Sequence, residues 1–210
     1  MLIERPPKLF RMMFPGALFR LPGNNRREPK SYLTFDDGPH PEVTPMVLDM
    51  LDRYDLKATF FMVGQNVERY PQLFDEVKKR GHMIGNHTYS HMKGFGKSTK
   101  EYVEDVEKGA MITGSKLFRP PHGLMTPSQF LALRKRYNIV MYDIVTRDYS
   151  SRLNSEQVLD NVIKYLRDGS IIVFHDSLKS LPRLKETLPQ ALDWILGEGF
   201  DSYFLPESKL

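Results

Sequence analysis

Four short polar segments hold most of the side chains in this sequence that could do acid–base or metal chemistry. They cover residues 34–41 (TFDDGPHP), 87–91 (HTYSH), 119–123 (RPPHG) and 171–176 (IIVFHD). The chain has six histidines, and five of them lie in these segments, namely His40, His87, His91, His122 and His175. Imidazole and carboxylate groups are common metal ligands and common proton carriers. Their clustering therefore predicts that the four segments meet in one site.

The first segment predicts two carboxylates with different tasks. Asp36 and Asp37 close an apolar stretch, and Gly38 and Pro39 then turn the chain. Adjacent side chains of a strand point to opposite faces, so a turn at the strand end lets one carboxylate reach a metal ion while the other faces a substrate. The sequence Asp-Gly-Pro is also common in simple turns, and this segment alone leaves both interpretations open.

The histidines of the second segment are spaced for metal binding. His87 and His91 lie four residues apart, and two such imidazoles converge if the segment forms one turn of a helix. With Asp37 they would make a set of two histidines and one carboxylate that leaves positions open for water and substrate. Such a set suits Zn²⁺ or another first-row divalent ion acting as a Lewis acid. The chain has no cysteine, which fits a catalytic zinc site better than a structural one.

The last two segments place an arginine and a histidine after apolar stretches. Arg119 can donate two hydrogen bonds to one carboxylate, and the prolines that follow it stiffen its loop. His175 comes directly after four apolar residues and would lie at the rim of a site. Taken alone, Arg119 could be a surface arginine and His175 a structural histidine. The functional interpretation depends on the four segments occurring together.

Strands and helices are predicted to alternate between residues 31 and 204. Strands are expected over 31–36, 58–63, 82–84, 117–118, 139–142, 170–174 and 200–204, and helices over 42–54, 71–80, 99–113, 127–137, 155–166 and 184–196. Short apolar strands with helices outside them predict a parallel sheet, either doubly wound or closed as a barrel. The glycine signatures of dinucleotide and P-loop sites are missing from the sequence. In a barrel, the catalytic groups lie at the carboxyl ends of the strands, where the four segments are expected.

The first 30 residues differ in composition from the remainder, and we expect them to form a basic, proline-rich arm before a catalytic domain of residues 31–210. The 210-residue chain has 30 Lys and Arg against 26 Asp and Glu, a formal charge of +4. Residues 1–30 hold seven basic and two acidic residues, whereas residues 31–210 hold 23 and 24. The excess positive charge is therefore outside the expected domain, and a nucleic-acid partner is not indicated.

The arm is expected either to pack against the domain or to contact a membrane surface, with apolar side chains in lipid and basic ones at the headgroups. Its five prolines exclude a long helix. It lacks the apolar core and small-residue cleavage site of a secretory signal peptide. No stretch of the sequence approaches the ~18–20 apolar residues of a spanning helix. We therefore expect a cytoplasmic protein, or one peripheral at the inner face of the membrane; the sequence predicts no oligomeric state.

In this order and spacing, the four segments resemble those of the polysaccharide deacetylases, the NodB-homology domains of carbohydrate esterase family 4. The resemblance covers about residues 31–204. It implies a distorted, incomplete (β/α) barrel, commonly with seven strands. It also implies that Asp37, His87 and His91 bind one divalent ion, with Zn²⁺ expected and Co²⁺, Ni²⁺ or Mn²⁺ as alternatives.

The resemblance further implies acid–base roles. Asp36 would be the base that takes a proton from the metal-bound water, and Arg119 would hold Asp36. His175 would be the acid that protonates the departing amine, or the alkoxide if an ester is cleaved. The metal and a backbone N–H, that of His122, would stabilise the oxyanion.

A further pair in the family, Asp-Trp, tunes the acid histidine and walls the pocket, and here Asp148 and Tyr149 match it. The chain departs from the family pattern at three positions. His122 stands where the family usually has Tyr, Tyr149 replaces Trp, and Val145 replaces an Asp. These changes concern the pocket wall, so the resemblance does not specify the substrate, while the metal and acid–base set is complete.

The sequence therefore predicts a metal-dependent hydrolase that removes acetyl or related acyl groups from an amino-sugar-containing glycan or glycoconjugate. One alternative is a carbohydrate-binding protein that keeps the fold without turnover, although the intact proton-transfer pair argues against it. Another is a metal-dependent phosphoesterase, although two-metal phosphohydrolases need more bridging ligands than are visible here. The exact substrate, its length, the choice between N- and O-deacetylation and the native metal stay open.

Overall fold

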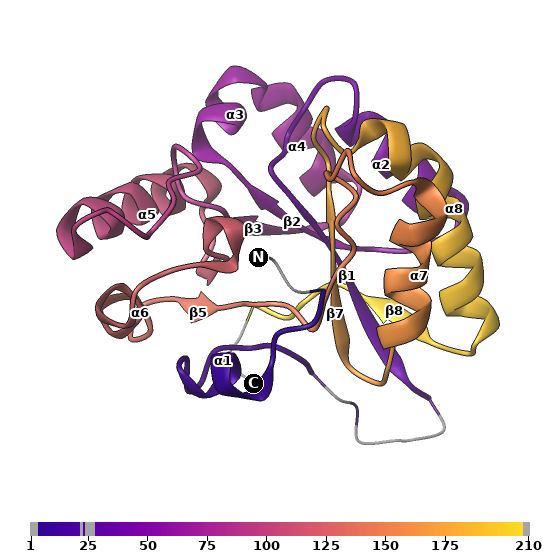
Figure 1. The fold of residues 1–210 in the computed structure, drawn as a ribbon. Helices are drawn as coiled ribbons and strands as arrows, with labels where there is room; N and C mark the ends of the chain where they lie inside the picture. Colours follow the sequence, from indigo (N-terminus) through magenta and orange to yellow (C-terminus); the bar gives the residue numbers. More distant parts are fainter. Residues whose placement is uncertain (1–3, 22, 24–27, 208–210) are drawn as a thin grey trace.

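The computed structural model describes residues 4–21, 23 and 28–207. In this part of the chain, seven strands run parallel in the order β5-β4-β3-β2-β1-β7-β6 and curl into an open barrel, with β8 paired to the start of β1 (Figure 1). The strands are β1 (Lys30–Asp36), β2 (Thr59–Met62), β3 (Met83–Asn86), β4 (Leu117–Phe118), β5 (Asn138–Ile139), β6 (Ile144–Val145), β7 (Ser170–His175) and β8 (Asp201–Tyr203). The predicted distorted, incomplete (β/α) barrel is confirmed.

Helices surround the sheet on its outer side (Figure 1). They are α1 (Lys8–Met12), α2 (Thr44–Arg53), α3 (Gly64–Arg69), α4 (Pro71–Lys79), α5 (Thr99–Thr113), α6 (Pro127–Leu133), α7 (Ser155–Tyr165) and α8 (Leu181–Gly197), with a 3₁₀ turn η1 (Pro121–Gly123). None of the helices in the described ranges is long and apolar enough to cross a bilayer.

Strand β1 lies at the centre of the core, between β2 and β7, and its register aligns the ends of these strands. Its ring of Phe35 stacks on Phe60 of β2, with ring centroids 5.1 Å apart, and on Phe174 of β7, at 5.8 Å. All three rings are fully buried, as expected for parallel strands covered on both faces. The same register pairs Asp36 with His175 at the end of the two strands.

Most predicted elements occur within a few residues of their expected bounds, but the short helices α1 and α3 and the two-residue strand β6 are not predicted from the sequence. The strand expected over residues 139–142 ends at Ile139, because its partner β4 ends at Phe118. The amide of Val140 still donates to the carbonyl of Phe118 at 2.8 Å, and Val140 also pairs with Leu18 of the N-terminal arm. Helix α3 is not predicted from the sequence. It is only six residues long and buries just Gly64 and Val67, which is too few to give a helical pattern.

The N-terminal arm closes part of the gap between the two edge strands of the open barrel. Leu18 accepts a hydrogen bond from the amide of Met141 and donates one to the carbonyl of Ile139, at 2.7 and 2.8 Å. At the other edge, the amide of Val145 in β6 donates to the carbonyl of Glu4 at 2.8 Å. The arm thus satisfies backbone groups that an exposed edge would leave unpaired.

The arm also contributes side chains to the core. Phe14 is 1% exposed, and its ring packs edge-on against Phe130 of α6, with centroids 5.3 Å apart. Arg11 donates from Nη2 to Oδ1 of Asp143 at 2.6 Å, and Asp143 is fully buried. Part of the arm's excess positive charge is therefore neutralised by an ion pair with a buried carboxylate of the domain. Residues 1–3, 22 and 24–27 of the expected arm lie outside the described residues.

Candidate active site

The four polar segments meet in one cavity of about 140 Å³ at the carboxyl ends of the strands. Its lining includes all but one of the predicted site residues, namely Asp36, Asp37, His87, His91, Arg119, His122, Tyr149 and His175. The exception, Asp148, is fully buried directly behind His175. A larger cavity of about 350 Å³ between the arm and α6 contains none of these acid–base groups, so its size does not indicate the reactive site.

Arg119 holds Asp36 through a buried ion pair. Nη1 of Arg119 lies 2.7 Å from Oδ1 of Asp36, and the side chains of both residues are nearly inaccessible to solvent. The sequence suggests that Arg119 could donate two hydrogen bonds to this carboxylate, but in the structure it donates one. Nη1 also donates to Oγ1 of Thr34 at 2.7 Å, and Nη2 donates to the carbonyl of Met141 at 3.0 Å. Oδ2 of Asp36 is left 4.0 Å from Nε2 of His87, at the predicted metal site.

Asp37, His87 and His91 converge as predicted, but not through a helical turn. Oδ1 of Asp37 lies 3.0 Å from Nε2 of His91 and 3.6 Å from Nε2 of His87. The segment from His87 to His91 is a loop in which Thr88 and His91 have φ values of 65° and 56°. Asp105 of α5 holds the loop by accepting hydrogen bonds from the amides of residues 89 and 90. These long-range bonds replace the intrahelical bonds that the spacing suggested.

The three residues fit a divalent metal ion. One ligand atom from each can be chosen so that all three lie within 4.8 Å of one another. Nδ1 of His87 donates to the carbonyl of Arg119 at 2.8 Å, which directs the lone pair of Nε2 toward Asp37. Burial lowers the pKa of His87 to about 4, so its imidazole is neutral at pH 7, as a ligand requires.

Asp37 is held in its ionised form. Burial alone would raise the pKa of its carboxyl group, but the hydrogen bond from His91 and the charges of the neighbouring histidines lower it below the usual value. An ionised carboxylate and two imidazoles are the oxygen and nitrogen donors of catalytic zinc sites. The donor set therefore agrees with the predicted ion, although it does not select among Zn²⁺, Co²⁺, Ni²⁺ and Mn²⁺.

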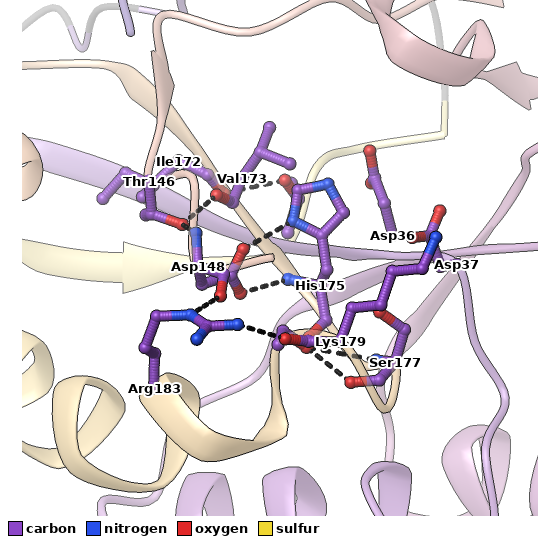
Figure 2. Close-up of polar contacts among 12 residues, drawn as sticks. Asp36, Asp37, Thr146, Asp148, Ile172, Val173, His175, Ser177, Lys179 and Arg183 are labelled. Carbon is purple, nitrogen blue, oxygen red and sulfur yellow. Dashed lines mark hydrogen bonds and ion pairs between the residues drawn. The ribbon is translucent and has the colours of Figure 1, made fainter. Parts of the chain in front are cut away.

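His175 is fixed and charged by Asp148. Nδ1 of His175 donates to Oδ1 of Asp148 at 2.7 Å, and the amide of His175 donates to Oδ2 at 2.8 Å. Burial would lower the pKa of His175, but the charge and hydrogen bond of Asp148, together with the two other aspartates nearby, raise it to about 9. Figure 2 shows the imidazole between Asp148 on one side and Asp36 on the other. His175 is therefore a protonated group facing the site at neutral pH.

The residues that depart from the family pattern form the wall of the cavity. The ring of Tyr149 meets His175 edge-on with centroids 4.7 Å apart, and Val145 lines the same side. The ring of His122 meets His91 edge-on at 5.0 Å, and His122 has a φ of 60°. Burial, followed by the charge of His91, lowers the pKa of His122 below its usual value.

Sequence reasoning missed two residues that support the acid–base groups. Thr34 receives the hydrogen bond from Arg119 and lies two positions before Asp36, so the period-two pattern of a strand could have placed it on the same face. Arg183 of α8 donates to the carbonyl oxygens of Asp148 and Lys179 (Figure 2). It thereby joins the loop that contains Asp148 to the loop that follows β7. Nothing in the local sequence indicates this role for Arg183.

Comparison with known proteins establishes the family. The model of the family described as "Polysaccharide deacetylase" matches residues 23–141, which is more than half of the chain. The chain belongs to the polysaccharide deacetylase family. The match includes Asp36, the predicted metal ligands and Arg119, and it ends before Asp148 and His175.

Relatives of this polysaccharide deacetylase have related names. A peptidoglycan-N-acetylglucosamine deacetylase of Bacillus cereus is 33% identical over 176 residues, covering 80% of this chain and 82% of the relative. A chitooligosaccharide deacetylase of Azorhizobium caulinodans is 32% identical over 154 residues, covering 69% and 72%. Other relatives are longer. This chain spans 32% of the peptidoglycan-N-acetylmuramic acid deacetylase PdaC of Bacillus subtilis, to which it is 33% identical over 150 residues.

The similarity in structure extends over nearly the whole chain. The crystal structure of the Bc1960 peptidoglycan N-acetylglucosamine deacetylase superposes with a TM-score of 0.84 and 29% identity, covering 97% of this chain and 99% of the other. That superposition includes the carboxyl-terminal part of the barrel, where the family model does not reach. The fold of nearly the whole chain is therefore that of the family. Its members are deacetylases that hydrolyse carbon–nitrogen bonds of acetylated sugars.

The His175–Asp148 pair predicts a specific pH dependence. The predicted role of His175 as the acid requires its protonated form, so kcat/KM is expected to fall as the pH rises through its pKa, which is about 9 in the ion-free protein. Replacing Asp148 by Asn removes the charge that offsets burial, and should move this alkaline limb about 1–3 pH units lower. The pH profile of kcat/KM measures the shift. Asp160→Asn, at an exposed position of α7, is the matched control and should leave the alkaline limb in place. An alkaline limb that stays in place in Asp148→Asn would show that this pair does not set it.

Proposed function

We propose that this protein is a metal-dependent N-deacetylase that hydrolyses acetamido groups of an amino-sugar glycan. One observation carries the proposal, namely that a complete metal-ligand set, Asp37, His87 and His91, shares one cavity with a carboxylate base and a protonated histidine. The names of the relatives support a substrate of the peptidoglycan or chitooligosaccharide type. Release of a related acyl group, or of acetate from an ester, would use the same side chains.

The first proton transfer is assigned to Asp36. A divalent ion held by Asp37, His87 and His91 would supply Lewis-acid polarisation of the acyl carbonyl and of the attacking water. Oδ1 of Asp36 is engaged by Arg119, so Oδ2 is the oxygen assigned to accept the water proton as the new carbon–oxygen bond forms. The backbone N–H of His122 is assigned to donate to the oxyanion that develops on the acyl oxygen.

The second proton transfer is assigned to His175. Its Nδ1 is occupied by Asp148, so Nε2 carries the proton that passes to the sugar nitrogen as the carbon–nitrogen bond breaks. An amide nitrogen is a poor leaving group unless it is protonated, which is why a histidine kept charged at neutral pH suits this step. The products are acetate and a free amino sugar. Tyr149, packed against the ring, limits its rotation and walls the substrate side.

Two alternatives stay distinguishable by experiment. One alternative is a binding protein without turnover. A structural neighbour with 22% identity and a TM-score of 0.78 is described as a mutant of a pseudoenzyme with restored activity, so this fold also occurs without turnover. Retention of base, acid and arginine in this chain argues against it. A phosphoesterase is disfavoured because only one cluster of three possible ligands is found among the described residues.

Substitution of the base tests the proposed reaction. Wild-type protein loaded with Zn²⁺, Co²⁺, Ni²⁺ or Mn²⁺ should release acetate from chitooligosaccharides or peptidoglycan fragments. Asp36→Asn should lower kcat about 10²–10⁴-fold, because general-base catalysis contributes about that much. Asp75→Asn, on the exposed face of α4, is the matched control and should keep wild-type activity. Glycan binding without acetate release, or phosphate release from phosphoesters, would contradict the proposal.

We also propose that the arm contacts anionic lipid at the inner face of the membrane. The supporting observation is that Leu9, Met12 and Met13 are 74%, 67% and 47% exposed on or beside α1, next to the basic Lys8. The double variant Leu9→Ser/Met12→Ser should bind vesicles containing anionic lipid several-fold more weakly in a sedimentation assay. Equal binding by both proteins would leave packing as the arm's only role. Deleting the arm is a poorer test, because it would also remove Phe14 from the core.

A further inference from the structure

The metal ligand Asp37 lies in a turn, residues 37–40, that is held from behind by side chains outside the catalytic set. Asp37 has a φ of 82°, a region of backbone conformation that residues other than glycine rarely adopt. Such a conformation persists only where surrounding contacts fix it. Nδ2 of Asn66, in α3, donates to the carbonyl of Asp37 at 2.8 Å, and the amide of Val63 donates to the carbonyl of Gly38 at 3.0 Å.

Thr44 and Asp176 fix the far end of the same turn. Oγ1 of Thr44 accepts a hydrogen bond from the amide of His40 at 2.8 Å and donates its single proton to Oδ2 of Asp176 at 2.6 Å. Both side chains are fully buried, so water does not replace either bond. Removing the hydroxyl would leave an amide and a carboxyl oxygen without partners in a dry site, which is costly.

Asp176 touches the turn in two further ways. Its backbone amide donates to the carbonyl of Asp36 at 3.0 Å, which joins the ends of β7 and β1. Its carboxyl group lies directly beside Gly38, where a Cβ atom would come within 2.0 Å of Oδ2. The other oxygen, Oδ1, has no hydrogen-bond partner among the described residues. Asp176 is thus a buried acid that neither proton transfer uses.

We propose that Asp176, Thr44 and Asn66 are positioning residues that place the Asp37 carboxylate opposite His87 and His91 and thereby set the affinity for the metal ion. The proposal rests on the proposed function only in taking these three residues as the ligands. Each positioning residue contacts a different point of the turn, namely its glycine, its last amide and its first carbonyl. Together they hold the turn in the conformation in which Asp37 has a positive φ.

Metal affinity of Thr44 variants tests this role. Thr44→Val keeps the size of the side chain but removes the hydroxyl, and should weaken Zn²⁺ binding about 10–100-fold, the range typical of residues that orient a ligand. Thr44→Ser keeps the hydroxyl and should stay within about threefold of wild type. Thr187→Val is the matched control, because Thr187 is also fully buried and donates one hydrogen bond, but on α8 to the carbonyl of Ser155. It should leave the Zn²⁺ affinity unchanged.

The dissociation constant for Zn²⁺ is measured by competition with a chelator, and the melting temperature is measured in parallel on the metal-free proteins. If Thr44→Val does not fold, Asn66→Ala provides the second variant, since Asn66 is only partly buried and anchors the other end of the turn; it should weaken Zn²⁺ binding about tenfold or more. Wild-type affinity in the folded Thr44→Val protein, or in Asn66→Ala if only that protein folds, would overturn the proposal, even if the melting temperature falls.

These outcomes are separate from those of the proposed function. A wild-type protein that binds Zn²⁺ but releases no acetate would contradict the deacetylase proposal, and the affinities of the variants would still decide whether the three residues position Asp37. A wild-type protein that binds no divalent ion would overturn both proposals.

Discussion

The buried ion pair between Asp36 and Arg119 is the interaction on which the remainder of the site depends. The guanidinium is 2% exposed and links β1, through Asp36 and Thr34, to the backbone beyond β5 at Met141. The backbone carbonyl of Arg119 also accepts a hydrogen bond from Nδ1 of His87, and this bond orients the imidazole toward Asp37. Breaking a buried pair leaves an uncompensated charge, so the pair is costly to disrupt. Arg119 therefore fixes both the proposed base, Asp36, and the predicted metal ligand His87.

The two adjacent carboxylates can do different work because each has its own partners. Asp36 ends β1 beside a guanidinium, whereas Asp37 follows it in a turn that faces two imidazoles. Asp148 is fully buried behind His175, and its hydrogen bond and charge raise the pKa of that histidine. The proposed base and the proposed acid thus have separate partners, an arrangement that allows one group to accept a proton while the other donates one.

Much of this arrangement follows from local sequence, and the part that does not follow depends on distant contacts. The helix over Thr99–Thr113 matches its prediction because its signals are local, with Ser98 capping its start and Gly114 ending it in the left-handed conformation. The convergence of His87 and His91 was predicted through the wrong geometry, since Asp105, far along the chain, shapes their loop. The arm's pairing with both barrel edges and the braced turn at Asp37 likewise rest on residues that no local pattern connects.

The central claim is that Asp37, His87 and His91 bind one catalytic ion while Asp36 stays free to act as the base. A crystal structure of the Zn²⁺-loaded protein, with the ion located by its anomalous scattering, tests it most directly. We expect a single zinc ion with Oδ1 of Asp37 and the Nε2 atoms of both histidines at about 2.0–2.2 Å, and with Asp36 still paired to Arg119. Zinc bound elsewhere, or coordinated by Asp36 in place of Asp37, would contradict it.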